Sequence, residues 1–196
     1  MKILAKKKCF QLMCDMQMPE HIMAHSIQVC RVGVCLVDFL KLQGFQMDEQ
    51  LVIAAALLHD ITKNRSFETE ENHALTGGQF LTDLGYPQVG ELVRQHVRLD
   101  DYSDPKRLTE AEIINYADKR VLHDRIVSLE ERMSYIRERY GQRPEHRHRI
   151  QLLWEKTEAL ERQIFRYLTF LPEDLNHYLH PMDISSEISK YRKICS

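Results

Sequence analysis

Residues 51–60 have the sequence Leu-Val-Ile-Ala-Ala-Ala-Leu-Leu-His-Asp, eight apolar residues followed directly by His59 and Asp60. Asp48 lies just before this run and is a residue type that caps helices, so the run predicts a helix over residues 49–61. Within that helix, His59 continues a series of apolar residues at steps of four and therefore projects from an apolar face. Ionisable side chains seldom end such a run, because burying an unpaired charge costs free energy. The stretch predicts a core helix that carries a functional site.

Helical periodicity continues on both sides of this stretch. Gly and Pro fall at the boundaries of the periodic segments, and no alternation of polar and apolar residues predicts a strand. We expect helices over residues 5–16, 19–43, 49–61, 73–85, 87–96, 109–122, 128–140 and 144–168, with polar loops at 64–72 and 100–105. Thr109 and Glu112 form a capping-box pattern for one of these helices. The chain is therefore predicted to be all-α, without a sheet of three or more strands.

Six ionisable side chains in all occupy apolar helix faces of this kind. They are His25, His59, Asp60, His73, His96 and Asp118. A single histidine in such a place is most often an ordinary core residue, so the inference depends on the whole set. Sharing a cation is an economical way to bury six such groups, and imidazoles with carboxylates suit Fe, Mn, Ni, Co or Zn, with Mg as a further candidate. Six ligands exceed what one ion usually takes, so we expect two divalent ions with a bridging carboxylate.

Three segments resemble the H…HD…D pattern of the HD-domain phosphohydrolases. They are His25-Ser26-Ile27-Gln28-Val29, Ala55-Ala56-Leu57-Leu58-His59-Asp60-Ile61-Thr62-Lys63 and Ala117-Asp118-Lys119. His73-Ala74-Leu75-Thr76-Gly77-Gly78 and Val93-Arg94-Gln95-His96 resemble the two extra histidines of the binuclear subgroups. Those subgroups include bacterial diadenosine tetraphosphate hydrolases and HD-type mixed-valence di-iron oxygenases. The resemblance spans about residues 20–125.

The resemblance implies a compact helical core around a binuclear centre. One metal would be held by His25, His59, Asp60 and Asp118, and Asp60 would bridge to a second metal held by His73 and His96. The implied activity is that of a phosphomonoesterase or phosphodiesterase, which acts on a nucleotide or another small phosphorylated metabolite through metal-activated water. The alternative is an HD-type mixed-valence di-iron oxygenase, because the same ligands serve oxygen activation.

Asp60 and Lys63 are the predicted catalytic residues, and Lys63 is also the predicted substrate-binding residue. The ammonium of Lys63 would stabilise charge that develops on the phosphoryl oxygens. Lys63 equally fits a solvated lysine that complements the dipole at a helix end. Further candidate phosphate contacts are Arg65, Arg98, Lys119 and Arg120.

The composition changes near residue 125, where short apolar helices give way to long helices rich in Arg and Glu. We predict a metal-binding catalytic core over residues 1–125 and a helical C-terminal extension over 126–196 that packs on the core or extends from it. An apolar stripe that includes Ile150, Leu160 and Ile164 runs along the extension. It is predicted to pack on the chain's own core, and the alternative is a partner-binding or homodimer face.

The overall composition disfavours several classes of protein. A net charge of -2 disfavours a general nucleic-acid-binding surface. The longest apolar run, residues 51–58, is far shorter than the roughly 20 residues of a membrane span, and no secretory signal follows the basic N-terminus. Five cysteines without a Cys-x-x-Cys pair favour reduced thiols and a cytoplasmic location.

Overall fold

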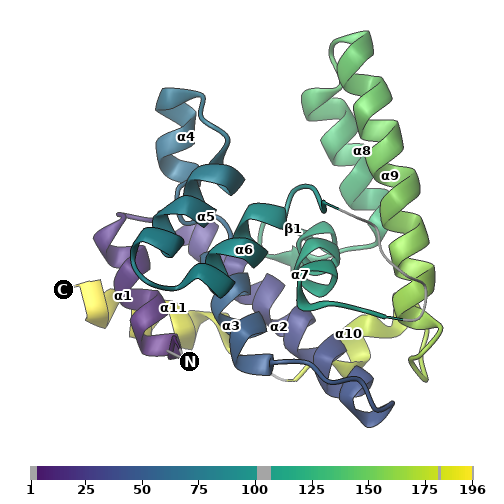
Figure 1. Cartoon of the computed structure of the whole chain (residues 1–196), viewed down its shortest axis with the longest axis horizontal. Helices are drawn as coiled ribbons and strands as arrows, with labels where there is room; N and C mark the ends of the chain where they lie inside the picture. Colours follow the sequence, from purple (N-terminus) through teal and green to yellow (C-terminus); the bar gives the residue numbers. More distant parts are fainter. Residues whose placement is uncertain (1–3, 101–106, 181, 196) are drawn as a thin grey trace.

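The computed structural model describes residues 4–100, 107–180 and 182–195 and is almost entirely helical (Figure 1). Its elements are α1 (Lys6–Asp15), α2 (Glu20–Leu42), α3 (Glu49–Leu58), α4 (Lys63–Thr69), α5 (His73–Asp83), α6 (Pro87–Gln95), α7 (Glu110–Lys119), β1 (Val121–Leu122), β2 (Arg125–Ile126), α8 (Leu129–Tyr140), α9 (Pro144–Phe165), the 3-10 helix η1 (Pro172–Asp174), α10 (Leu175–Tyr178) and α11 (Ile184–Cys195). The predicted all-α class is confirmed.

Helix starts follow the capping residues that the sequence offers. The Asp48 side chain accepts a hydrogen bond from the Leu51 N–H, and Ser128 accepts one from the Glu131 N–H. Thr109 and Glu112 form the expected capping box at the start of α7, with both reciprocal bonds present. Each cap satisfies backbone donors that the first helical turn leaves unpaired, so these boundaries could be found from local sequence.

Two local predictions are wrong. Residues 64–72 were expected to form a loop, but Lys63–Thr69 form helix α4. All of α4 is described and no residue of it is buried, so it has no apolar stripe from which periodicity could reveal it. The antiparallel hairpin β1–β2 was also not expected, and its two-residue strands are too short to show alternation. Of the loop predicted at 100–105, everything beyond residue 100 lies outside the described residues.

Helix α2 forms the centre of the core and packs against α3, α7 and α11. Of the described helices, α2 alone is long and apolar enough to cross a membrane by composition, yet 78% of its most apolar window is buried inside the protein. Its inward side chains include Met23, Ile27 and Leu36, each almost inaccessible to solvent. The composition of α2 is thus that of a core helix.

Helices α5 and α6 pack against each other backbone to backbone. The contact is made by Gly78 on α5 and Gly90 on α6. A Cβ atom added at Gly90 would overlap the Gly78 carbonyl oxygen and lie 2.5 Å from Thr82 Oγ1. A Cβ atom added at Gly78 would lie 2.7 Å from the Gly90 carbonyl oxygen. This close approach matters for the site, because α5 begins at His73 and α6 ends just before His96.

Gly90→Ala is expected to destabilise the protein by about 1–3 kcal/mol, because the added methyl group must push the two helix backbones apart. The loss should appear even though alanine favours a helix by up to about 1 kcal/mol over glycine. The free energy of unfolding in denaturant measures it. Gln88→Ala, on an exposed position of the same helix, is the control and should change little. A Gly90→Ala variant as stable as the parent would show that the contact is not tight.

The C-terminal segment lies against the first helix. Tyr191 of α11 is buried and donates a hydrogen bond from its hydroxyl to the Met18 carbonyl oxygen. Next to it, a disulfide joins Cys14 of α1 to Cys195 of α11. The prediction that all five cysteines are reduced is therefore wrong for this pair, whose members are brought together by the packing of the two helices. The other three, Cys9, Cys30 and Cys35, are buried free thiols, as expected of core residues.

Helices α8 and α9 pack as a pair that projects from the core on the side opposite α4 (Figure 1). The C-terminal half of α9 anchors the pair, because Leu160 and Ile164 belong to the main hydrophobic core. Arg120 strengthens this junction by donating hydrogen bonds to the Val127 and Pro172 carbonyl oxygens. The apolar stripe therefore packs on the chain's own core at these positions, and Arg120 is a structural residue and not a phosphate contact.

Candidate metal centre

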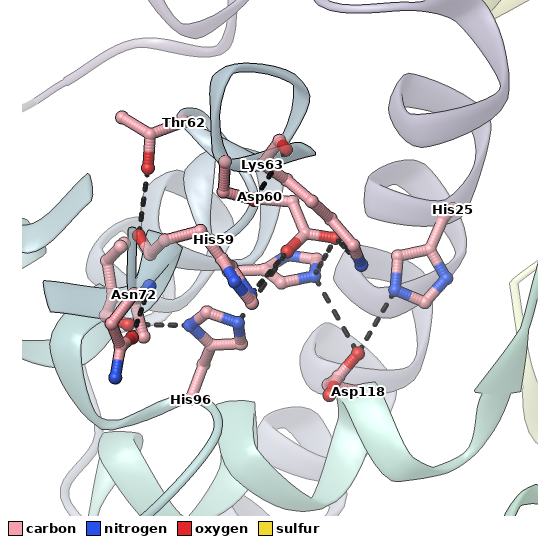
Figure 2. Close-up of polar contacts among 12 residues, drawn as sticks. His25, His59, Asp60, Thr62, Lys63, Asn72, His96 and Asp118 are labelled. Carbon is pink, nitrogen blue, oxygen red and sulfur yellow. Dashed lines mark hydrogen bonds and ion pairs between the residues drawn. The ribbon is translucent and has the colours of Figure 1, made fainter. Parts of the chain in front are cut away.

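The six predicted ligands come from five parts of the chain, and five of them line one pocket: His25, Asp60, His73, His96 and Asp118. The sixth, His59, is fully buried beside Asp60. Figure 2 shows His25, His59, Asp60, His96 and Asp118 turned toward one another. His25 lies on α2, Asp118 on α7, and His73 is the first residue of α5. The pair His59-Asp60 follows directly on α3, and His96 follows α6. Five of the six are buried, and His73 is the partly exposed member. The six side chains predicted from periodicity thus lie close together, although the helix predicted over residues 49–61 ends at Leu58, so His59, Asp60 and His96 lie just beyond the ends of their helices.

One half of the cluster contains His25, His59 and Asp118. Asp118 Oδ1 lies 3.1 Å from His25 Nε2 and 3.7 Å from His59 Nε2. One donor atom from each of the three residues can be chosen so that all lie within 4.8 Å of one another. This half is compact enough for its three residues to share one cation.

The other half is built around Asp60. Its Oδ1 lies 3.3 Å from His73 Nε2 and 3.6 Å from His96 Nε2. Its Oδ2 lies 3.4 Å from His59 Nε2, which also faces the first half. Asp60 therefore stands between two groups of histidines, the position that a bridging carboxylate requires.

Three of the imidazoles are oriented by backbone carbonyl oxygens, which can only accept hydrogen bonds. The Nδ1 atoms of His59 and His96 donate to carbonyl oxygens three residues earlier, at 2.7 Å in both cases. His25 Nδ1 donates to the carbonyl oxygen of His123 at 2.9 Å. A ring that donates from Nδ1 and is neutral presents the lone pair of Nε2, and here each Nε2 faces the carboxylates. The rings are thus held in the tautomer that binds metal.

Two buried polar atoms of the cluster, His59 Nε2 and Asp60 Oδ1, have no hydrogen-bond partner among the described residues. Leaving such groups unsatisfied costs about 1–3 kcal/mol each, and more for a charged group. Both atoms carry lone pairs, and no hydrogen-bond donor among the described residues contacts either of them. A divalent cation would satisfy both, and the residues present therefore fit a metal.

The charges of the site also suit a metal. Burial raises the pKa of Asp60, but His59 and Lys63 outweigh it and hold the pKa well below its usual value. The pKa of Asp118 is likewise held low against burial, chiefly by Lys119. Burial lowers the pKa of His96 to about 4. Ionised carboxylates and a neutral imidazole are the forms that coordinate cations.

Residues behind the ligands hold α6 against α7. The buried ammonium of Lys119 donates to Asp118 Oδ2 and to the His96 carbonyl oxygen, both at 2.9 Å. Asn115 donates to the same carbonyl oxygen at 2.9 Å. Lys119, considered above as a phosphate contact, thus uses its ammonium to position His96 and Asp118.

Lys63 lies at the edge of the cluster and reaches into the pocket. Its Nζ is 2.7 Å from Asp60 Oδ2, and its side chain is 29% exposed. Lys63 is the first residue of α4, and the start of a helix disfavours a positive charge. The interpretation as a lysine that complements a helix dipole is therefore wrong. Arg65 and Arg98, the other two predicted phosphate contacts, are not among the described residues that line the pocket. Arg65 pairs instead with Glu71.

Above the cluster opens a cavity of about 610 Å³. Its walls are α4, through Lys63, Ser66 and Phe67, and α8, with further residues from neighbouring elements. The residues of α8 that line it are Arg132, Tyr135, Ile136, Arg139 and Tyr140. These residues were missed in the sequence, because periodicity shows that a helix has a face but not what that face covers.

The hairpin turn is a second feature that the sequence did not reveal. His123 has a φ of 56°, in the left-handed region, and this conformation turns its carbonyl oxygen toward His25. The next residue, Asp124, accepts a hydrogen bond from Gln28 through its carbonyl oxygen at 2.7 Å. The hairpin thus fixes the orientation of His25 from outside the helical part of the site.

A helical fold with four histidines and two aspartates gathered in a buried cluster defines a metal-binding helical protein. The sequence model described as HD domain matches residues 22–121, and the chain belongs to that family. The family is one of metal-dependent hydrolases, and all six residues of the cluster lie within the matched range.

One curated relative is an uncharacterized protein of Methanocaldococcus jannaschii. It is 29% identical to this chain over 76 residues, which are 39% of this chain and 44% of the archaeal protein. The match thus covers less than half of the relative, and its printed name gives no activity. No solved structure gave a significant match.

Proposed function

We propose that this protein is a phosphohydrolase that uses divalent metal ions to cleave a phosphate ester, with a nucleotide or another small phosphorylated metabolite as substrate. The observation that carries the proposal is that Lys63 and Arg132 line the same pocket as five of the six residues of the cluster. Cations beside a metal cluster favour an anionic substrate whose charge increases during the reaction.

The metals would be held in two groups. His25, His59 and Asp118 would hold one cation, His73 and His96 would hold the other, and Asp60 would contact both. A divalent cation in such a site supplies Lewis acidity, which lowers the pKa of a water molecule and offsets charge on the phosphoryl oxygens. The ionised carboxylates and the neutral His96 ring described above are in the protonation states that coordinate a cation.

Lys63 would bind the phosphoryl group itself. Burial lowers its pKa, but the nearby carboxylates of Asp60 and Asp118 outweigh that effect and raise it, so the side chain is cationic. Its contact with Asp60 Oδ2 keeps the ammonium beside the cluster, where it can also donate to a phosphoryl oxygen. Lys63 thus holds one oxygen of Asp60, and the other oxygen, which has no hydrogen-bond partner among the described residues, is left to contact a cation.

A screen of phosphate esters tests the proposal. Protein stripped of metal would be supplied separately with Mn, Co, Ni, Fe, Zn or Mg and offered nucleotides, sugar phosphates and phosphodiesters. We expect release of phosphate, or scission of a diester, that requires added metal and is lost on chelation. Oxygen consumption by the iron-loaded protein without cleavage of any ester would instead support the di-iron oxygenase and overturn the proposal.

A further inference from the structure

Helix α8 presents a regular face to the pocket. Arg132 is followed by Tyr135 and Ile136 three and four residues later, and by Arg139 and Tyr140 seven and eight residues later. Residues at these spacings lie on one side of a helix, and all five line the cavity. The face lies outside residues 22–121, which match the family, so it is a feature of this chain's own extension.

Arg132 is the member of this face closest to the metal cluster. Its side chain is 13% exposed, and its Nη2 lies 3.8 Å from Asp118 Oδ1, too far for a hydrogen bond. Its buried Nε has no hydrogen-bond partner within residues 4–100, 107–180 and 182–195. A buried guanidinium with an unused donor is costly unless something in the pocket accepts from it. Two parallel N–H groups match two oxygens of a phosphate group.

Aromatic rings continue the same walls toward the mouth of the cavity. Tyr135 is held in place by an edge-on contact with His123, with ring centroids 5.5 Å apart, and by a hydrogen bond from Arg139 to its hydroxyl. Tyr140 on α8 is 54% exposed, and Phe67 on α4 is 65% exposed. Two large rings left in solvent at the mouth of one pocket indicate a surface that an apolar, flat group can cover.

The two helices therefore offer the same order of groups from the base of the pocket outward. On α4, the cation Lys63 is followed one turn later by Phe67. On α8, the cation Arg132 is followed by Tyr135 and, two turns on, by Tyr140. Figure 1 shows α4 and α8 rising on opposite sides of the helices that carry the ligands. A ligand that fills this pocket would have its anionic end near the cluster and its flat end between the helices.

We propose that α8 is the specificity wall of this site. Arg132 binds the phosphate group of the substrate, and Tyr135 and Tyr140, together with Phe67, hold a planar aromatic ring system attached to it. The substrate class is a phosphate ester of a compound with a planar aromatic ring, such as a nucleoside. Sugar phosphates that lack an aromatic ring are disfavoured. A volume of about 610 Å³ is ample for such a molecule. This assignment rests on the proposed phosphohydrolase function and adds the part of the substrate that function leaves open.

Equilibrium binding to the metal-loaded protein tests the wall without relying on turnover. The probes are adenosine monophosphate, ribose 5-phosphate and inorganic phosphate. We expect the nucleotide to bind at least about tenfold more tightly than ribose 5-phosphate, because stacking on aromatic side chains adds about 1–3 kcal/mol per base. A protein carrying both Phe67→Leu and Tyr135→Leu should lose most of that preference and keep its affinity for inorganic phosphate.

Arg132→Gln should weaken all three probes by about ten- to a hundredfold and leave the metal content unchanged, and Arg132→Lys should restore part of the loss. Arg137→Gln is the matched control, because Arg137 is exposed on the same helix and is not among the described residues that line the pocket. Equal affinity for the nucleotide and ribose 5-phosphate, or no effect of Arg132→Gln on phosphate binding, would overturn the assignment of α8 as the specificity wall. If the binding pattern holds but no ester is cleaved with any metal, the phosphohydrolase function fails and the wall stands.

Discussion

Replacing Asp60 with alanine is expected to remove bound metal and activity together. Its carboxylate lies within 3.3–3.6 Å of His59, His73 and His96, so its loss removes the carboxylate that contacts both halves of the cluster. The variant also leaves Lys63 without its anionic partner, which places an uncompensated positive charge where cations would bind. Metal content of the purified variant and turnover on the best substrate would both fall to background.

Three companion variants make this result interpretable. Asp60→Asn keeps the shape of the side chain but removes its charge, and it should also lose metal. His73→Ala should be milder, because His73 is partly exposed and contacts one half of the cluster. Asp83→Ala, on the exposed side of α5, should change neither quantity. Full metal content and turnover in a folded Asp60→Ala protein would show that the centre has been placed on the wrong residues.

Lys63→Ala is expected to leave metal content intact and to lower kcat/KM toward phosphate esters by about ten- to a thousandfold. The ammonium is the cation of α4 that contacts the cluster, at 2.7 Å from Asp60, and it would stabilise charge that builds up on the phosphoryl oxygens in the transition state. Lys63→Arg should recover part of the activity, because a planar fork does not replace a compact ammonium.

The reference for this variant is Lys41→Ala, whose ammonium pairs with Glu49 far from the cavity and should matter little. Separate values of kcat and KM give more information than their ratio. A fall confined to kcat would show that Lys63 contacts the substrate only in the transition state, and a rise confined to KM would show that it binds the ground state and the transition state equally. A kinetically silent Lys63→Ala would remove the assigned role of this residue and leave the phosphate assignment resting on Arg132 and the family.

The candidate ligands could be found in the sequence because each lies in, or directly after, a helix with a clear apolar stripe. His59 and Asp118 are surrounded in sequence by residues that are fully buried, such as Ala55, Leu58 and Ile114. An ionisable residue in such a stripe points inward, and the structure brings the six side chains together. Periodicity selected the candidates, and their division between two metals came from the resemblance to the HD family.

The walls of the pocket could not be predicted in the same way. Helix α4 has no buried residue, so nothing in its sequence marked it as a helix. The sequence of α8 predicted a helix but carried no information on which part of the chain its faces lie against. The Cys14–Cys195 pair is separated by 181 residues, and no local spacing indicates such a partner. Each of these features depends on tertiary contacts between distant segments, and helical periodicity carries no information about such contacts.

The same cross-link has a consequence for the unfolded chain. A bond between residues 181 apart closes a very long loop, which removes conformational entropy from the denatured ensemble. In the chain-entropy description, closing a loop of this size is worth about 5 kcal/mol at room temperature. All six ligands lie inside that loop. With the bond formed, global opening that exposes the cluster is therefore rarer by roughly four orders of magnitude, so the integrity of the cluster depends on a pair of sulfur atoms that do not contact it.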